Sequence, residues 1–168
     1  MVQRIMVVGC CGAGKSTLAR KLQQKTGLDV YHLDQYYWKA DWKETPMEDW
    51  EPVVQELCMK DAWIIDGNYG STMDRRLKRA DTVIYLDFPI YKCLWRITKR
   101  ILKYRGTERP DMTTGCKERF DLEFYHYVAT FNLLRRKPIL DKLKTLDNSK
   151  KVFIFKSDKQ TEAYLKTL

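Results

Sequence analysis

The chain has 168 residues and a net charge of +9 at pH 7, with 44% hydrophobic and 32% charged residues. This length suits one domain with a substantial core, and this composition excludes a disordered or fibrous protein. No apolar run approaches a membrane span, and the first apolar run begins too close to Met1 to leave room for a signal peptide. We therefore expect one cytoplasmic domain over residues 1–168, a monomer or homodimer that does not bind membranes.

The five cysteines are odd in number and contain no C-x-x-C pair. This indicates reduced thiols rather than a disulfide framework or a zinc site. Cys10 and Cys11 suggest a redox-sensing hypothesis, because a thiol at a helix N-terminus can be acidified. The alternative, which we favour, is that two small side chains simply fill variable positions of a loop.

The first predicted strand, residues 5–8, leads into the segment Gly9-Cys10-Cys11-Gly12-Ala13-Gly14-Lys15-Ser16-Thr17. This segment fills every fixed position of the phosphate-binding pattern G-x-x-x-x-G-K-[ST]. Its glycines let backbone N–H groups surround phosphate oxygens at the N-terminus of a helix. Lys15 is expected to reach the β- and γ-phosphates, and Ser16 to ligate Mg²⁺. The segment predicts a nucleoside triphosphate site; the alternative is a glycine-rich turn that binds nothing.

Hydrophobic runs alternate with helical patterns along the whole chain. This alternation predicts βαβ units and a parallel sheet covered by helices on both faces. The expected strands are residues 5–8, 30–33, 63–65, 82–86 and 152–155. The predicted fold class is therefore α/β, with three layers and a five-stranded parallel sheet.

Asp34 directly follows the second predicted strand. Ligands of open parallel sheets bind beyond the carboxyl ends of the strands, so Asp34 is expected to face the nucleotide site. The alternative is a carboxylate that only caps a turn. Large aromatic residues follow in a polar connection, and they form either a wall of a small-molecule pocket or the core of a helical excursion: Tyr36, Tyr37, Trp38, Trp42 and Trp50.

Residues 45–48 have the form of a capping box with Pro46 at the first helical position. A helix is predicted from there to about residue 60. Pro52 fits poorly inside it, which predicts either a kink or a helix that begins near Asp49.

Asp66 directly follows the third predicted strand and opens the sequence Asp66-Gly67-Asn68-Tyr69. A carboxylate in this position is what the Mg²⁺ site of a phosphate-loop enzyme requires. An Asp-Gly pair is also a common turn, so the signal depends on its combination with the phosphate loop.

Basic residues are densest between Arg75 and Arg109. A short helix over 71–79 is followed by a longer one from Ile90 towards Gly106, on which Arg96 and Arg100 lie four residues apart and share a face. These arginines are expected to bind polyphosphate; the alternative is a solvated basic surface. Residues 107–117, which include Arg109, have no helical or strand period and are expected to form a surface loop.

A helical pattern resumes at about Glu118, with an apolar stripe of Phe120, Phe124, Val128, Phe131 and Leu134. Pro138 is expected to break or bend this helix, and a further helical pattern continues to Asn148. Residues 157–160 form a second capping box, for a C-terminal helix.

The order of strands and motifs resembles the nucleoside monophosphate kinase group, which includes adenylate and shikimate kinases. The motif 64–67 resembles the strand-end Asp-Gly of adenylate kinases, and 96–100 resembles the arginine pair that enters their lid. A short lid at about 105–120 is therefore expected. Asn68-Tyr69 replaces the Phe-Pro-Arg that follows Asp-Gly in adenylate kinases, and the lid has no zinc ligand set, so AMP is not the expected acceptor.

A second resemblance, covering nearly the whole chain, is to a bacterial family of DNA topology modulation proteins. It rests on residues 32–38, 66–69 and 109–116. That family name implies an effect on DNA supercoiling, whereas the motifs resemble those of kinases.

The kinase resemblance implies residue roles. It implies that residues 9–17 bind ATP, that Ser16 and Asp66 support Mg²⁺, and that Arg96 lies near the base and Arg100 near the phosphates. Asp34 occupies the place at which shikimate and uridine kinases hold an acceptor hydroxyl. The acceptor side is expected to include Asp34, Tyr37, Trp38, Gly67, Asn68 and Tyr69, and the groups expected at the reaction centre are Lys15, Asp34, Arg96, Arg100 and Arg109.

Three functions are compared. The favoured one is transfer of the γ-phosphoryl group of ATP to a nucleoside, nucleotide or other small hydroxyl acceptor, with Mg²⁺ as cofactor. The second is a nucleotide-dependent DNA-binding regulator; basic charge favours it, but no helix-turn-helix, zinc finger or basic tail is present. The third, a GTP-driven switch, lacks an Asn-Lys-x-Asp motif.

Overall fold

The computed structural model describes residues 2–109 and 111–168. Met1, to which the expectation about a signal peptide was tied, and Pro110, within the 109–116 motif, lie outside the described residues. No helix in the described part of the chain has the length and apolar character needed to cross a membrane.

Five strands of the described chain form one parallel sheet in the order β2-β5-β1-β6-β7. They are β1 (Arg4–Gly9), β2 (Val30–His32), β5 (Trp63–Asp66), β6 (Thr82–Leu86) and β7 (Lys151–Phe155). The residues of β1 from Ile5 to Val8 have no exposed surface. A strand buried on both faces needs a continuous apolar run, which is why β1 was recognisable from sequence. The predicted α/β class with a five-stranded parallel sheet is confirmed.

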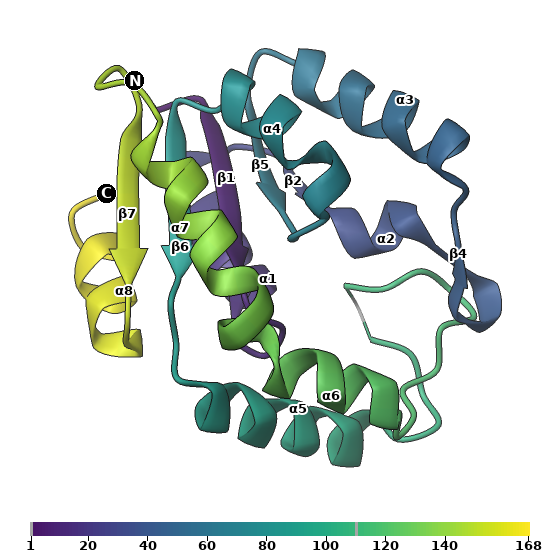
Figure 1. The fold of residues 1–168 in the computed structure, drawn as a ribbon. Helices are drawn as coiled ribbons and strands as arrows, with labels where there is room; N and C mark the ends of the chain where they lie inside the picture. The colour runs from purple at the N-terminus through teal and green to yellow at the C-terminus, as the bar shows by residue number, and fades with distance from the viewer. Residues whose placement is uncertain (1, 110) are drawn as a thin grey trace.

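Helices cover both faces of this sheet (Figure 1). Helix α1 and helix α8 contact each other on one face, and α4 and α7 lie across the other. The larger helices are α1 (Lys15–Thr26), α3 (Met47–Met59), α4 (Gly70–Arg79), α5 (Ile90–Tyr104), α6 (Leu122–Ala129), α7 (Lys137–Lys144) and α8 (Asp158–Leu165). Three layers therefore surround one core.

The carboxyl ends of β1, β2 and β5 meet at one edge of the sheet. The register pairs His32 of β2 with Asp66 of β5, and Asp66 with Val7 of β1. The turn after β1 is the segment 9–17, and α1 begins at Lys15. Polar groups that are far apart in the sequence are thus brought to the edge where parallel sheets bind ligands.

Asp34 does not end a strand. Strand β2 stops at His32, and the short helix α2 (Leu33–Tyr37) begins with the buried Leu33, which prolongs the apolar run and obscures the boundary. A small hairpin follows, made of β3 (Trp38–Lys39), the 3₁₀ turn η1 (Ala40–Trp42) and β4 (Lys43–Glu44). Of the aromatic residues in this region, Trp50 is fully buried, in agreement with the core alternative.

The predicted capping box at 45–48 is wrong. Helix α3 begins at Met47 with Pro46 as its N-cap, and the Thr45 hydroxyl donates to the Tyr37 carbonyl at 2.6 Å instead. Pro52 lies inside α3, so the helix does not begin near Asp49. The carbonyl of Pro46 accepts from both Asp49 and Trp50, which closes the first turn before Pro52.

The predicted helix start at Glu118 is also wrong. Helix α6 begins at Leu122, with the Asp121 carboxylate accepting from the Phe124 N–H at 3.0 Å. Phe120 is 64% exposed and Leu134 is 60% exposed, so neither belongs to a buried stripe. Glu118 belongs to the preceding loop, where its carboxylate lies beside Arg100 and Arg109.

Pro138 neither breaks nor ends the helical region. A π-helical turn, η2 (Asn132–Arg136), directly precedes α7. Pro138 lies in the first turn of α7, where the missing N–H costs little free energy. Helix α7 ends at Lys144 rather than at Asn148. The second capping box holds in part, because the Ser157 side chain accepts from the Gln160 N–H.

Arg76 is a buried cation rather than part of a polyphosphate site. It has no exposed surface, and its guanidinium donates to the carbonyls of Gly67 (2.7 Å), Tyr69 (2.8 Å) and Asn68. Burial lowers the pKa of Arg76 to about 10, which leaves it charged at pH 7. The guanidinium therefore holds the turn that follows β5.

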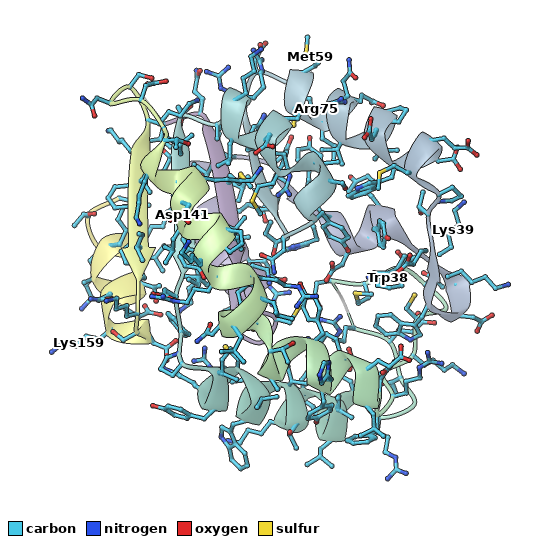
Figure 2. All side chains as sticks on the ribbon, in the orientation of Figure 1. Trp38, Lys39, Met59, Arg75, Asp141 and Lys159 are labelled. Atoms are coloured by element: carbon cyan, nitrogen blue, oxygen red, sulfur yellow. The ribbon has the colours of Figure 1, made fainter. Side chains whose placement is uncertain are left out.

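We predict that Arg76→Met lowers the free energy of unfolding by about 3 kcal/mol or more, because three buried carbonyls lose their donors at about 1–3 kcal/mol each. Arg75→Met is the matched control. Arg75 is exposed at the periphery of the same helix (Figure 2), and its ion pair with Glu51 spans 3.8 Å, so we expect a loss of about 1 kcal/mol or less. Urea denaturation of both variants checks this, and equal losses would contradict it.

Candidate active site

The segment 9–17, here called the phosphate loop, has the backbone that an anion cradle needs. Gly12 and Gly14 adopt positive φ angles of 79° and 98°. A Cβ at Gly12 would lie 2.4 Å from the Cys93 carbonyl of α5, so only glycine fits there. The first N–H groups of α1 have no acceptors within the helix and carry the positive end of its dipole. This arrangement suits polyphosphate.

Lys15 lies at the first position of α1, with its ammonium 3.3 Å from the Cys10 carbonyl. Burial lowers the pKa of Lys15, but Cys11, Asp34 and Asp66 together raise it by more, so the pKa lies above its ordinary value. The side chain is therefore cationic at pH 7. Its charge is directed towards the same cavity as the loop.

His32 and Asp66 form a hydrogen-bonded pair at the sheet edge. The distance between His32 Nδ1 and Asp66 Oδ1 is 2.8 Å, and the two side chains are 12% and 4% exposed. Burial alone would lower the pKa of His32, but the hydrogen bond and the charge of Asp66 raise it above its ordinary value. The pair follows from the register, in which the two residues are direct partners.

The turn after β5 connects the phosphate loop with α2. The Asn68 side chain accepts from the Gly9 N–H at 3.0 Å, and the Tyr69 hydroxyl donates to Asp34 Oδ1 at 2.6 Å. Tyr69 adopts a left-handed conformation with φ 34°. Burial, followed by the charge of Asp34, raises the pKa of Tyr69. The phenol therefore stays protonated and holds the Asp34 carboxylate in place.

Arg96 connects α5, the phosphate loop and α8. Its Nη2 donates to both carboxylate oxygens of Asp158, at 2.7 and 2.8 Å, and its Nη1 donates to the Ala13 carbonyl at 3.2 Å. Lys92 also contacts Asp158, at 2.6 Å. Asp158 is the first residue of α8, where a negative charge is favoured by the helix dipole.

Arg100 and Arg109 share one carboxylate. Glu118 Oε1 lies 2.5 Å from Arg109 Nε and 3.4 Å from Arg100 Nε, and Arg109 also lies 3.3 Å from Asp111. Burial and then the charge of Arg109 lower the pKa of Arg100. Arg100, Arg109, Asp111 and Glu118 are thus packed together. The two arginines compensate the charge of Glu118, which explains how it can be buried outside any helix.

These groups surround one cavity of about 630 Å³. Residues 11–17 of the phosphate loop line it, together with Asp34, Asp66, Gly67, Arg96, Arg100 and Arg109. Tyr37, Trp38, Asn68 and Tyr69 are not among its lining residues, nor are Gly9 and Cys10. Residues 11–17, Arg96 and Arg100, which were predicted to bind ATP, thus line one cavity. Tyr37, Trp38 and Tyr69 lie outside its lining. Tyr37, for example, packs its ring 4.7 Å from that of Tyr69.

The described part of the loop between α5 and α6, residues 105–109 and 111–121, lies against the α2–β4 segment (Figure 1). Four hydrogen bonds join them: Thr113 Oγ1 to the Gln35 carbonyl (2.7 Å), Asp41 N–H to the Gly115 carbonyl (3.1 Å), Trp42 Nε1 to the Lys117 carbonyl (2.9 Å), and Cys116 Sγ to the Lys39 carbonyl (3.2 Å). Figure 2 marks the contacted segment by Trp38 and Lys39. We call residues 105–109 and 111–121 the covering loop.

The cavity fits Mg²⁺ and a nucleotide. Mg²⁺ is usually held by one or two carboxylates together with substrate phosphates and water, rather than by a cage of protein ligands. Ser16 and Asp66 line the cavity at the phosphate loop, and Asp111 of the covering loop joins them. In the described part of the chain no cluster of three or more His, Cys, Asp or Glu residues could hold a metal by itself.

The structure does not support acidified thiols in the phosphate loop. A hydrogen bond with Cys93, followed by burial, raises the pKa of Cys10, and burial raises that of Cys11. Both thiols are therefore protonated at neutral pH, and the small-side-chain interpretation is the one that fits.

Sequence reasoning missed His32, Asp111, Glu118 and Asp158. His32 had a usable signal, because it is a polar residue at the carboxyl end of an apolar strand. The other three had none, because each lies in or beside a loop, and the arginines of α5 that pair with Glu118 and Asp158 give no local pattern.

No family model matches the chain. Curated relatives do: shikimate kinase 1 of Escherichia coli (strain K12 / DH10B) and that of Shigella boydii serotype 18 (strain CDC 3083-94 / BS512) are each 30% identical over 109 residues. The matched region is 56% of this chain and 63% of each relative, so the chain spans less than two thirds of the relatives it matches.

Solved structures share the fold over nearly the whole chain. Shikimate kinase from Acinetobacter baumannii in complex with shikimate has a TM-score of 0.61 at 17% identity, covering 99% of this chain and 90% of that one. Shikimate kinase from Bacteroides thetaiotaomicron has a TM-score of 0.59 at 16% identity, with coverages of 99% and 96%. A sugar kinase from Janibacter sp. HTCC2649 has a TM-score of 0.54 at 17% identity, with coverages of 99% and 94%. The chain therefore has the phosphate-loop kinase fold.

We predict that Asp66→Asn lowers the pKa of His32, because burial remains while the charge that opposes it is removed. NMR titration of the His32 ring measures this, with His126→Gln used to assign the second histidine. A pKa unchanged by the substitution would contradict the pairing.

Because the folded-state pKa of His32 is raised, its pairing with Asp66 stabilises the fold below about pH 6.5. That contribution is lost as the pH rises through the folded pKa, so the stability cost of His32→Asn should shrink with rising pH.

We predict that Gly115→Ala detaches the covering loop, because a Cβ there would lie 2.7 Å from the Ala40 Cβ. Gly106→Ala is the control: Gly106 also has a positive φ, 71°, but its Cβ position has nothing within 4 Å. Both variants place an alanine in left-handed backbone, which costs about 1–2 kcal/mol of stability. Only Gly115→Ala also creates a steric clash. Faster tryptic cleavage after Lys117 in Gly115→Ala than in Gly106→Ala is expected; equal rates would show that the contact does not hold the loop.

Proposed function

We propose that this chain is an ATP- and Mg²⁺-dependent kinase that transfers the γ-phosphoryl group to a hydroxyl of a small molecule. One observation carries the proposal: the phosphate loop, Lys15, Asp34 and Asp66 face a single cavity together with Arg109 from the covering loop. The similarity to shikimate kinases and the shared kinase fold support it.

On the donor side, the N–H groups of the phosphate loop would hold the β- and γ-phosphates. Mg²⁺, when bound at Ser16 and Asp66, would neutralise phosphate charge. Phosphoryl transfer depends mainly on positioning and charge neutralisation, and Lys15 and Arg100 line the cavity as cations suited to both. Arg96 contacts the loop at Ala13 and would support the nucleotide from the α8 side.

On the acceptor side, Asp34 would orient the hydroxyl or accept its proton. Its carboxylate lines the cavity and is held from behind by the Tyr69 phenol at 2.6 Å. Gly67 lines the cavity beside it. Tyr37, Trp38, Asn68 and Tyr69 would act by positioning, because they are not part of the lining. The covering loop would exclude water from the site.

The acceptor class is open to a direct test. Purified protein with Mg-ATP is given shikimate, sugars, nucleosides and nucleotides in turn, and ADP formation is measured. Lys15→Ala measures the background. Acceptor-dependent ADP production well above that background supports the proposal, and none with any acceptor would remove its main support.

We predict that Asp34→Asn lowers kcat by about 10²–10⁴-fold, the range typical of a general base or orienting group, while the Kd for Mg-ATP stays nearly unchanged. Tyr69→Phe, which removes only the hydrogen bond to Asp34, should have a smaller effect. Steady-state kinetics and nucleotide titration measure both. Full activity in Asp34→Asn would exclude this carboxylate from the reaction.

A DNA-binding role is the alternative, and the ion pairs weigh against it. Arginines of the central region form ion pairs: Arg75 with Glu51, Arg96 with Asp158, and Arg100 and Arg109 with Glu118. Their charge is therefore not free for a DNA backbone. Binding of duplex DNA with a steep dependence on salt concentration would restore the DNA topology interpretation.

A further inference from the structure

The cavity extends from the phosphate loop towards both edges of the sheet. Helix α2 follows the edge strand β2, α8 follows the edge strand β7, and the phosphate loop follows β1 between them (Figure 1). Asp34 lines the cavity on the α2 side, and four residues spaced along one face of α8 line the other side: Asp158, Thr161, Glu162 and Leu165. Since the acceptor is expected at Asp34, the α8 side remains for the nucleoside of a bound triphosphate.

Three groups hold Arg96 on the α8 side of the cavity. Its Nη2 donates to both carboxylate oxygens of Asp158, its Nη1 donates to the Ala13 carbonyl, and its Cζ lies 5.5 Å from the centroid of the Phe88 ring. The side chain also lines the cavity and is 33% exposed, so part of the guanidinium is accessible to a ligand. A planar guanidinium can stack on an aromatic ring, including that of a base.

Asp158 compensates the charge of Arg96. It also contacts Lys92 at 2.6 Å, and its place at the start of α8 favours a negative charge. Burial raises the pKa of Asp158, but hydrogen bonds from Arg96 and Lys92 lower it by more, so the group is a carboxylate at neutral pH. Because its charge is compensated, Arg96 is better suited to stack on a base than to neutralise phosphate.

We propose that Asp158 is a positioning residue that fixes the Arg96 guanidinium as a planar support for the base, and so makes α8 part of the nucleotide site. The inference rests on the proposed function, because it assumes that the cavity binds a nucleoside triphosphate. It assigns Arg96 to the nucleoside, whereas Lys15 and Arg100 remain suited to the phosphates.

Removal of the Asp158 charge should act in opposite directions on the two parts of the nucleotide. In Asp158→Asn the cavity gains one positive charge, so inorganic tripolyphosphate should bind as tightly as before or more tightly. Arg96 loses its fixed position, so the contribution of the nucleoside to binding should fall. A change that merely disturbed the fold would weaken the binding of both ligands equally.

The experiment measures the Kd of ATP and of inorganic tripolyphosphate by isothermal titration calorimetry in the same Mg²⁺ buffer. The ratio of the two constants gives the preference for the nucleoside. In Asp158→Asn we expect this preference to fall by about fivefold, the effect typical of one cation–π contact. Asp158→Glu, which keeps the charge, should recover part of it. Because the Asp158 side chain is 49% exposed, its ion pairs contribute little to stability, and both variants should fold.

Asp141→Asn is the matched control. Asp141 lies on α7 (Figure 2), outside the cavity lining. Its side chain is also 49% exposed, and it also pairs with two cations, Lys137 and Lys144. The substitution makes the same charge change, so it should leave the preference for the nucleoside unchanged.

A double-mutant cycle tests whether Asp158 acts through Arg96. Arg96→Met removes the proposed support itself and should lower the preference for the nucleoside at least as much as Asp158→Asn does. Adding Asp158→Asn to Arg96→Met should then cause no further loss of that preference.

The outcomes separate the two proposals. An unchanged preference in Asp158→Asn, equal weakening of both ligands, or a further loss in the double variant overturns the role of Asp158 and leaves the kinase proposal standing. A wild-type preference near or below one does the same. A wild-type protein that binds neither ATP nor tripolyphosphate overturns both.

Discussion

A single buried guanidinium supports both halves of the candidate site. Arg76 holds the carbonyls of residues 67–69, and that turn in turn places Asn68 against Gly9 and Tyr69 against Asp34. The same three residues therefore hold both the phosphate loop, at Gly9, and the carboxylate of Asp34. Burying a cation costs free energy, and the three carbonyls that accept from Nη1 and Nη2 of Arg76 offset part of that cost, so this turn has little freedom to rearrange. Rigidity of this kind suits a site that must hold two ligands in fixed relative positions.

The covering loop shows how a segment with no regular secondary structure becomes ordered. Charged groups compensate one another there: Glu118 of the loop lies between Arg109 of the loop and Arg100 of α5, and Asp111 lies beside Arg109. Its backbone carbonyls accept hydrogen bonds from the α2–β4 segment. Neither set of contacts involves a large apolar core, so the loop is held by polar contacts that can exchange with water or ligand more readily than packed side chains can.

Much of the fold could be predicted because its signals are local. The phosphate loop is contiguous, and strand β6 was predicted to the residue because both of its faces are buried. The predicted ends of elements were wrong where a flanking residue fits the pattern of the element beside it. Leu33 prolongs the apolar run of β2, and Glu118 fits the helical pattern that precedes α6. The direction of a charged side chain could not be predicted at all: composition counts Arg76 with the other basic residues, yet it points into the core. Pairs such as Arg100 with Glu118 and Arg96 with Asp158 depend on tertiary packing, which no spacing in the sequence encodes.

The contact of Gly12 with Cys93 has a mechanical consequence. Helix α5 is pressed against the phosphate loop near its start and leads directly into the covering loop at its end. From Cys93 to Tyr104 the helix extends about 16 Å. A tilt of about 5° at the phosphate loop would move the far end of the helix by about 1.5 Å, which is half the length of a hydrogen bond. A small adjustment of the phosphate loop would therefore cause a larger displacement where the covering loop is attached.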